Sequence, residues 1–405
     1  MDIVALLPNK TYIDRIITFG KATLLAGCSL LAFPRPVMAH NDLVLLDAVY
    51  VADIWHNFRG GLRTGTKYLD NLDLMLTVDS RAFGVENGTF FAYGLYNNNT
   101  TLSDTLVGDA QTISNIDATQ HFRLEEFWYE QRFAGGAASV KAGLIDLNSE
   151  FDAKDTAGLF IDSSHGIGPD FSQTGENGPS IFPTTSLAVR LDWKISHSLL
   201  IRVAAFDAVP NDPAHPKRLK LSWGEGTLFV AEGEYTLNSG TRIGIGGWQY
   251  SSQFDPILPV NGRKVRGNNG LYLYAEGPLY RESQGMNEGL DGFIRIGVAD
   301  STINQFASYW STGVVYTGLF KGRSADQTGL AIAYAVNGSD FKQSVFAGGG
   351  LADSAEINIE LTYRAQLTDW FAIQPDIQYV INPGAAGGLQ NALVAGLRFE
   401  IGASF

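Results

Sequence analysis

The sequence predicts an all-β fold, a single antiparallel transmembrane β-barrel of about 16 strands with short turns at one end and long loops at the other. Three observations predict it. Apolar residues alternate with polar or charged ones at a period of two. The last strand carries one wholly apolar face. Finally, the 366 residues that follow a leader provide enough chain for that strand number, at roughly 23 residues per strand and connection.

The closing strand, Asn391 to Phe405, shows the alternation most clearly. Leu393 and every second residue onward to Phe405 are apolar, whereas Arg398 and Glu400 lie on the opposite face. An apolar face opposite a charged one fits a strand between lipid and a water-filled lumen. We expect Phe405 to lie at the periplasmic rim, where its strand closes the barrel against a first strand near Val49 to Trp55.

Other segments repeat the pattern. Ser186 to Ile195 places Arg190, Asp192 and Lys194 opposite an apolar face, and Glu356 to Leu367 alternates polar or charged residues with apolar ones. Only Thr368-Asp369-Trp370 separates the latter from a strand beginning at Phe371. A sandwich would bury one face in a dry core, so recurring charge favours a hydrated barrel interior. Further strands are expected at Leu199 to Ala205, Thr227 to Leu237 and Gly292 to Ala299.

Connections of two lengths support the barrel. Residues 40–49 either lead into the first strand or form a short plug-like helix. The turns Ser196-His197-Ser198 and Thr368-Asp369-Trp370 are expected to be periplasmic. The expected extracellular loops, rich in Gly, Asn and Pro, are Asn97 to Asn115, Asp207 to Lys220, Phe254 to Asn269 and Asn337 to Gly350.

Residues 1–39 have the pattern of a secretory signal peptide, and residues 40–405 are expected to form the single barrel domain. Three basic residues precede the apolar run Ala22 to Phe33, which ends in Val37-Met38-Ala39. Twelve apolar residues are too few for a spanning helix, which takes about 20. An alternative is processing at Leu25-Ala26-Gly27-Cys28, which would leave Cys28 lipidated.

Composition excludes several functional classes. After the leader, 25 basic residues stand against 40 acidic ones, a formal charge of −15, which argues against nucleic acid as a partner. Cys28 is the only cysteine, so the mature chain has no thiol chemistry. No zinc-binding or nucleophile-elbow motif is present, and Gly244, Gly246 and Gly247 lie in an alternating strand rather than before a helix. The sequence therefore predicts no enzyme, cofactor or metal site.

The stretch Phe122 to Phe182 carries a family resemblance. Its segments Phe127 to Gln131, Gly143 to Phe151, Ser163 to Phe171 and Gly178 to Pro183 resemble the OprB-type carbohydrate-selective porins of Gram-negative outer membranes. Downstream, Gly322-Arg323 with Asp326 and Gly329, and Trp370 with Gln374-Pro375-Asp376 and Gln378-Tyr379, are similar to the same family. The segment before the first strand is shorter than in the usual pattern.

The resemblance implies a passive diffusion channel for mono- and short oligosaccharides, with loops folded into the barrel to form a constriction. Expected partners are carbohydrate solutes, outer-membrane lipids and, through the strand ending at Phe405, the barrel-assembly machinery; a homo-oligomer is possible. The alternatives are a secreted all-β carbohydrate-binding protein and a non-selective general porin. A barrel hydrolase would need a nucleophile and base that the sequence does not offer.

Strand phase selects the residues expected to line the channel, although most of the charged ones are expected to form structural ion pairs. Trp248 could stack on a pyranose or belong to the interfacial girdle, and for Tyr272 and Tyr274 the girdle is favoured. The loop Ile161 to Thr185 is either an inward-folded constriction or an ordinary surface loop, and the resemblance favours the constriction, with candidates His165, Asp170 and Glu176. The channel-lining candidates are Arg190, Asp192, Arg202, Glu232, Glu234, Arg242, Trp248, Arg295, Glu360 and Arg364.

Overall fold

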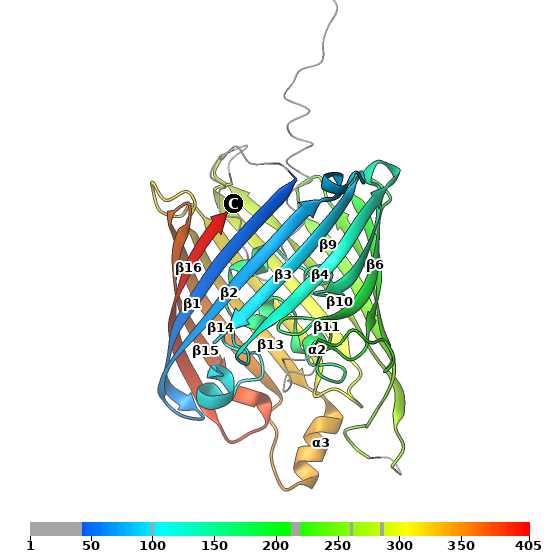
Figure 1. Cartoon of the computed structure of the whole chain (residues 1–405). Helices are drawn as coiled ribbons and strands as arrows, with labels where there is room; N and C mark the ends of the chain where they lie inside the picture. Colours follow the sequence, from blue (N-terminus) through cyan, green and yellow to red (C-terminus); the bar gives the residue numbers. More distant parts are fainter. Residues whose placement is uncertain (1–42, 99–100, 212–218, 260–261, 284–286) are drawn as a thin grey trace, which may run out of the picture.

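The computed structural model describes residues 43–98, 101–211, 219–259, 262–283 and 287–405. The expected signal peptide and Cys28 lie outside these residues. Sixteen antiparallel strands form one closed barrel in which each strand pairs with its neighbours in sequence (Figure 1), so the predicted fold is confirmed. The strands are β1 (Val44–Gly61), β2 (Gly65–Asp79), β3 (Gly88–Asn97), β4 (His121–Phe133), β5 (Ala138–Ile145), β6 (Ser186–Lys194), β7 (Leu199–Asp207), β8 (Thr227–Thr236), β9 (Arg242–Phe254), β10 (Val265–Arg281), β11 (Gly289–Ala299), β12 (Phe306–Thr317), β13 (Gln327–Asn337), β14 (Ala355–Thr368), β15 (Phe371–Ile381) and β16 (Gln390–Ser404).

The barrel closes where the closing strand was expected to pair. In the β1/β16 ladder Val49 lies opposite Gly402 and Trp55 opposite Gly396. The backbone of Phe405 also exchanges two hydrogen bonds with Leu46, at 2.8 and 3.1 Å. Residues from Val44 onward are therefore strand and not a plug-like helix.

The longest connections all lie at one end of the barrel. The chain terminus and the turns after β6 and β14 share the end drawn at the top of Figure 1, and helix α3 (Ser339–Ala347) marks the other. The four expected long loops all fall at the α3 end. The bounds of these loops differ from the prediction. Because β9 continues to Phe254 and β10 begins at Val265, that loop is shortened to residues 255–264, whereas the other three loops extend four to six residues further, to the starts of β4, β8 and β14.

Outward side chains of the strands are mostly apolar, whereas the inner face carries most of the charged ones together with aromatic and small apolar side chains. Val189 and Leu191 of β6 are 48% and 43% exposed, whereas Arg190 between them is 3% exposed. Large aromatic side chains face outward near the short-turn end, as in the interfacial girdle of a membrane barrel; these are Phe133, Trp193, Tyr235, Tyr280 and Trp370. Within the described ranges, no helix is long and apolar enough to cross a membrane.

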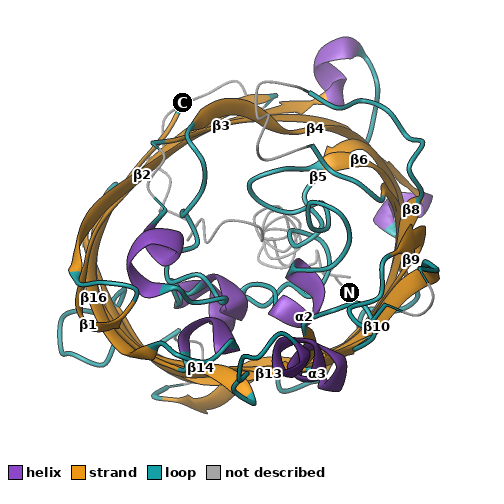
Figure 2. Cartoon of the chain, turned by 90° about the horizontal axis from the view of Figure 1, so that it is seen from below, coloured by secondary structure: helices purple, strands orange, loops and turns teal. Residues whose placement is uncertain are grey.

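Two connections from the α3 end fold back inside the barrel, where they cross the lumen seen in Figure 2. We name them the first inward loop (residues 101–120) and the second inward loop (residues 146–185). They contain most of the short helices. The first holds η2 (Ser103–Val107), and the second holds η4 (Thr156–Leu159), η5 (Ser163–His165) and α2 (Pro169–Ser172). Elsewhere lie η1 (Ser80–Phe83), η3 (Ala134–Gly136) and η6 (Pro383–Ala385).

Candidate functional site between two inward loops

Three glutamates of the barrel wall bind the backbone of the second inward loop. The carboxylate of Glu232 on β8 accepts one loop amide, whereas Glu276 on β10 and Glu360 on β14 each accept two. The donors are the amides of Asp152 (2.8 Å), Asp155 and Thr156 (3.0 and 2.7 Å), and Ile161 and Asp162 (2.6 and 3.1 Å). Buried amides need acceptors, and ionised ones bind them most strongly. These glutamates therefore hold an irregular segment against the wall.

Arg295 on β11 holds the same loop by charge. Its guanidinium lies 2.9 Å from Asp152 and 2.5 Å from Asp170, and all three side chains are completely buried. Neighbouring Gly297 makes room for this group, because a Cβ there would lie 2.1 Å from the Asp170 carboxylate. Arg295 and Asp170 thus face the barrel interior, but they contact each other and are not exposed to a passing solute.

Trp248 on β9 is also covered by the second inward loop. Its ring stacks on Phe171 with 5.0 Å between centroids and 5° between planes, and its side chain is 3% exposed. The girdle alternative is therefore wrong for Trp248. Phe171 already occupies one face of the indole, so that face is closed to a stacking sugar.

Tyr272 and Tyr274 on β10 face the interior, so the girdle expectation for them is wrong. They are 2% and 1% exposed, and the Tyr272 hydroxyl donates to Glu232 at 2.7 Å. Both rings lie across β9, where a Cβ on Gly244 or Gly246 would come within 2.2 Å of them. The glycine-rich stretch of β9 therefore makes space for rings from the neighbouring strand.

The remaining charged candidates form ion pairs on the wall. Arg190 lies between Glu130 and Glu150 at 3.0 Å from each. Arg202 pairs with Asp192 at 2.8 Å. Arg242 pairs with Glu276 and lies 3.4 Å from Glu234, and Arg364 lies 2.7 Å from Glu400. All of these side chains lie on the inner face, and their charges are compensated there.

The first inward loop is held by β14, the strand that also carries Glu360, and by the barrel seam. Glu356 on β14 accepts the amides of Ala110 and Gln111 at 2.8 and 2.9 Å. At the barrel seam Arg398 of β16 pairs with Asp53 of β1 at 2.8 Å and donates to Asn115 at 2.8 Å. The charge that the closing strand carries thus fixes a loop as well as the seam.

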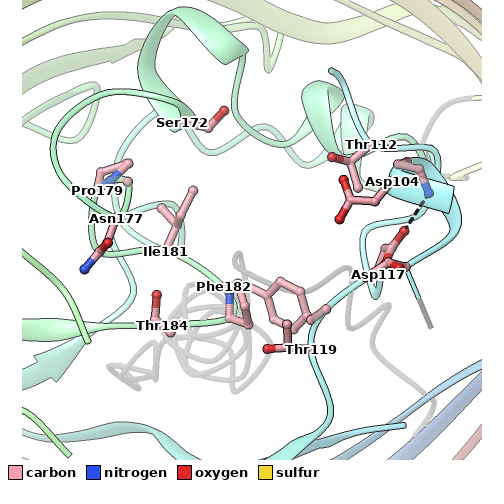
Figure 3. A pocket seen from close by; sticks show the side chains of 15 residues that line it. Asp104, Thr112, Asp117, Thr119, Ser172, Asn177, Pro179, Ile181, Phe182 and Thr184 are labelled. Carbon is pink, nitrogen blue, oxygen red and sulfur yellow. Dashed lines mark hydrogen bonds between the residues drawn. The ribbon is translucent and has the colours of Figure 1, made fainter. Parts of the chain in front are cut away.

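A pocket of about 290 Å³ lies between the two inward loops, as Figure 3 shows. Its wall combines hydroxyl groups, two carboxylates and apolar surface. Its lining comes from the first inward loop, through Thr101, Ser103, Asp104, Thr112, Asp117, Ala118 and Thr119, and from the second, through Ser172, Asn177, Gly178, Pro179, Ile181, Phe182, Pro183 and Thr184. The volume is near the lower limit for small-molecule sites, about 300 Å³.

Asp117 is the titratable group at the centre of this wall. Its Oδ2 accepts the amides of Leu102 and Ser103 at 2.8 and 3.1 Å, at the start of η2. Burial raises the pKa of Asp117 to about 7, and the charges of Asp109 and Asp104 act in the same direction, whereas the two amides oppose it. Asp117 therefore changes charge near neutral pH.

The three constriction-loop candidates have different environments. His165 is completely buried, and burial lowers its pKa to about 3, so its imidazole is neutral. Asp170 binds Arg295, and only Glu176 is exposed. None of the three lines the pocket, and the prediction missed the first inward loop. A possible signal was the cluster of Asp104, Asp109 and Asp117, which has no basic residue within it.

The chain is similar to known proteins in both sequence and fold. A family model described as "Carbohydrate-selective porin, OprB family" matches residues 63–402. Porin B of Pseudomonas aeruginosa is 26% identical over 404 residues, covering 87% of this chain and 86% of that protein. The high-pH structure of Pseudomonas putida OprB aligns with a TM-score of 0.81 at 22% identity, covering 90% and 94% of the two chains. The outer-membrane channel DcaP of Acinetobacter baumannii aligns at 0.54 and 10% identity, covering 93% and 100%.

Proposed function

The chain belongs to the OprB family of carbohydrate-selective porins, and we propose that its solutes pass through the pocket between the two inward loops. It is an outer-membrane porin that conducts carbohydrates passively. Its long loops face outward from the cell and its short turns face the periplasm. The family is one of channels and not of enzymes, and we propose no catalytic role for this member. Passage needs only groups that replace part of the sugar's hydration shell and bind weakly enough to release it.

The composition of the pocket wall carries this proposal. A pyranose has hydroxyls around its edge and apolar C–H faces. Hydroxyl side chains such as Thr119 and Thr184 can donate to and accept from the edge, and the Asp117 carboxylate can accept from it. The Phe182 ring and the neighbouring prolines supply apolar surface for a face. All of these groups line the pocket.

Charged residues of the barrel wall support the pocket without lining it. Glu232, Glu360 and Arg295 hold the second inward loop, and this loop provides half of the pocket lining. We therefore propose that they determine the width of the path without contacting the sugar. Glu176 is exposed, and we propose that it lies at the entrance.

Planar-bilayer recordings test the function. Ion current through the purified porin should fall when glucose is added, because sugar and ions share one path. Reconstituted vesicles should swell faster in glucose than in non-carbohydrate solutes of equal size. Absence of block, together with equal swelling rates, would leave a general pore in place of a carbohydrate-selective one.

We further propose that the barrel-assembly machinery recognises the strand ending at Phe405. The backbone of this residue pairs with Leu46 and extends the barrel seam by one position. Deleting Phe405 should lower the amount of assembled porin and leave the sugar block per channel unchanged. Normal assembly with poor conduction would contradict this role. The homo-oligomer stays a prediction, which sedimentation of the detergent-solubilised porin would check.

A further inference from the structure

The described residues that line the pocket carry negative charge and no positive charge. Among the described residues that line it, the charged side chains are Asp104 and Asp117. Asp104 is exposed, and within the described part of the chain no hydrogen bond or ion pair engages its carboxylate. Both hydrogen bonds to Asp117 reach Oδ2, so Oδ1 remains available to a solute.

Two basic residues of the described chain reach this region. Arg63 donates from Nε to the backbone oxygen of Thr105 at 3.0 Å, and it forms no ion pair with Asp104. The other is Arg123 of β4, whose position limits its effect. The guanidinium donates to the backbone oxygens of Thr119 and Pro183, both at 2.8 Å, and so ties the two inward loops together. These donors point at the loop backbone, and the nearby Glu125 carboxylate offsets the positive charge of the Arg123 guanidinium. Arg123 therefore supports the pocket and does not neutralise both carboxylates in front of it.

We propose that the pocket selects among sugars by charge, favouring amino sugars that carry an ammonium group over neutral sugars, and neutral sugars over sugar acids. This inference rests on the proposed function, because it requires solutes to pass through the pocket. The physical reason is direct: an ammonium gains attraction from two carboxylates that form no ion pair within the described residues, whereas a sugar carboxylate is repelled. A narrow cavity with low-dielectric walls strengthens such fields, and salt weakens them.

The test uses the whole porin in planar bilayers at pH 7 and low salt. Block of the ion current is measured with glucosamine, N-acetylglucosamine and glucuronate, which have similar rings and positive, zero and negative charge. The permeability ratio of potassium to chloride is measured from the reversal potential in a salt gradient. The variants are Asp104→Asn and Asp117→Asn, with Asp340→Asn on α3 as a control, because it removes the same charge at the same end of the barrel.

The native porin should bind glucosamine more tightly than N-acetylglucosamine and glucuronate least, and it should prefer potassium. Asp104→Asn should weaken glucosamine block by roughly two- to fivefold, the range of one solvent-exposed ion pair, and leave N-acetylglucosamine unchanged. Asp340→Asn should change neither. Asp104 is exposed, and among the described residues no hydrogen bond or ion pair involves its carboxylate. Asp104→Asn should therefore fold normally, so it still tests the charge selection if Asp117→Asn assembles poorly.

Two negative results have different meanings. If N-acetylglucosamine and glucose failed to block the native porin, the proposed path itself would be wrong. If both blocked, while glucosamine and glucuronate bound equally well and Asp104→Asn changed neither the block nor the permeability ratio, the charge selection would be overturned and the sugar path would stand.

Discussion

Two regions of this barrel use charge in opposite ways. On the wall beneath the second inward loop, charged side chains are buried against partners, and Arg295 between Asp152 and Asp170 is completely buried. In the pocket between the loops, the Asp104 carboxylate is exposed, and Asp117 binds only backbone amides. Paired charges therefore hold the loop in the first region, whereas the carboxylates of the second region can act on solutes.

The largest effect is expected from breaking the buried wall group. Arg295→Met leaves Asp152 and Asp170 without their cation, a change that costs about 3–5 kcal/mol in buried ion pairs. The second inward loop should leave the wall, so single-channel conductance should rise and glucose block should disappear. Arg281→Met is the control, because its pair with Asp291 is partly exposed and is worth about 0–1 kcal/mol. Equal conductance of the two variants would contradict the anchoring role.

A smaller effect is expected from weakening one backbone anchor. Glu360→Gln replaces one of the two oxygens that accept the Ile161 and Asp162 amides by an NH2 group, which cannot accept, and a buried donor left without an acceptor costs about 1–3 kcal/mol. Hydrogen exchange followed by mass spectrometry should show faster exchange in residues 156–166 and no change in the first inward loop.

Glu356→Gln is the matched variant for that experiment. Glu356 accepts the amides of Ala110 and Gln111, so its substitution should accelerate exchange in the first inward loop and spare residues 156–166. If both variants loosened the same loop, the wall glutamates would not act as separate anchors.

The smallest effect concerns pH and the pocket. Asp117 is ionised above a pKa of about 7 and protonated below it, so the potassium preference should decrease as pH falls from 8 to 6. Asp117→Asn should strongly reduce this dependence. The remaining neighbour Asp109, whose pKa burial raises to about 6, does not line the pocket. The folded-state pKa is higher than the ordinary value of about 3.9. Folding therefore binds a proton between these values, and the stability of the porin should decrease as pH rises toward 7. A preference that stays constant from pH 8 to 6 would contradict this assignment.

The strands could be predicted from sequence because each obeys a local rule. The alternation around Arg190 and Arg398 indicates which side chains point inward, and the apolar face that ends at Phe405 identifies the closing strand. Pairing with Val49 to Trp55 then follows from closure. The prediction for Tyr272 and Tyr274 was wrong because phase alone does not show that β9 glycines leave space for their rings.

The inward loops could not be placed in the same way, because they have no periodicity. Glu232 and Glu360 were predicted to face the lumen, and they do, but their partners in the second inward loop are backbone amides, which every residue except proline possesses. Asp104 and Asp117 were not selected because their role depends on the second inward loop, distant in sequence, forming the other side of the pocket.

The claim that sugars cross this pocket is tested most directly by blocking it chemically. Ser172 lines the pocket from α2, and Cys28 is the only native cysteine, so Ser172→Cys introduces one thiol after the leader. A bulky thiol reagent should reduce both conductance and glucose-driven vesicle swelling in this variant, and it should change neither in Ser339→Cys on the exposed helix α3. Unchanged glucose flux after complete modification of Cys at position 172 would place the path elsewhere in the barrel.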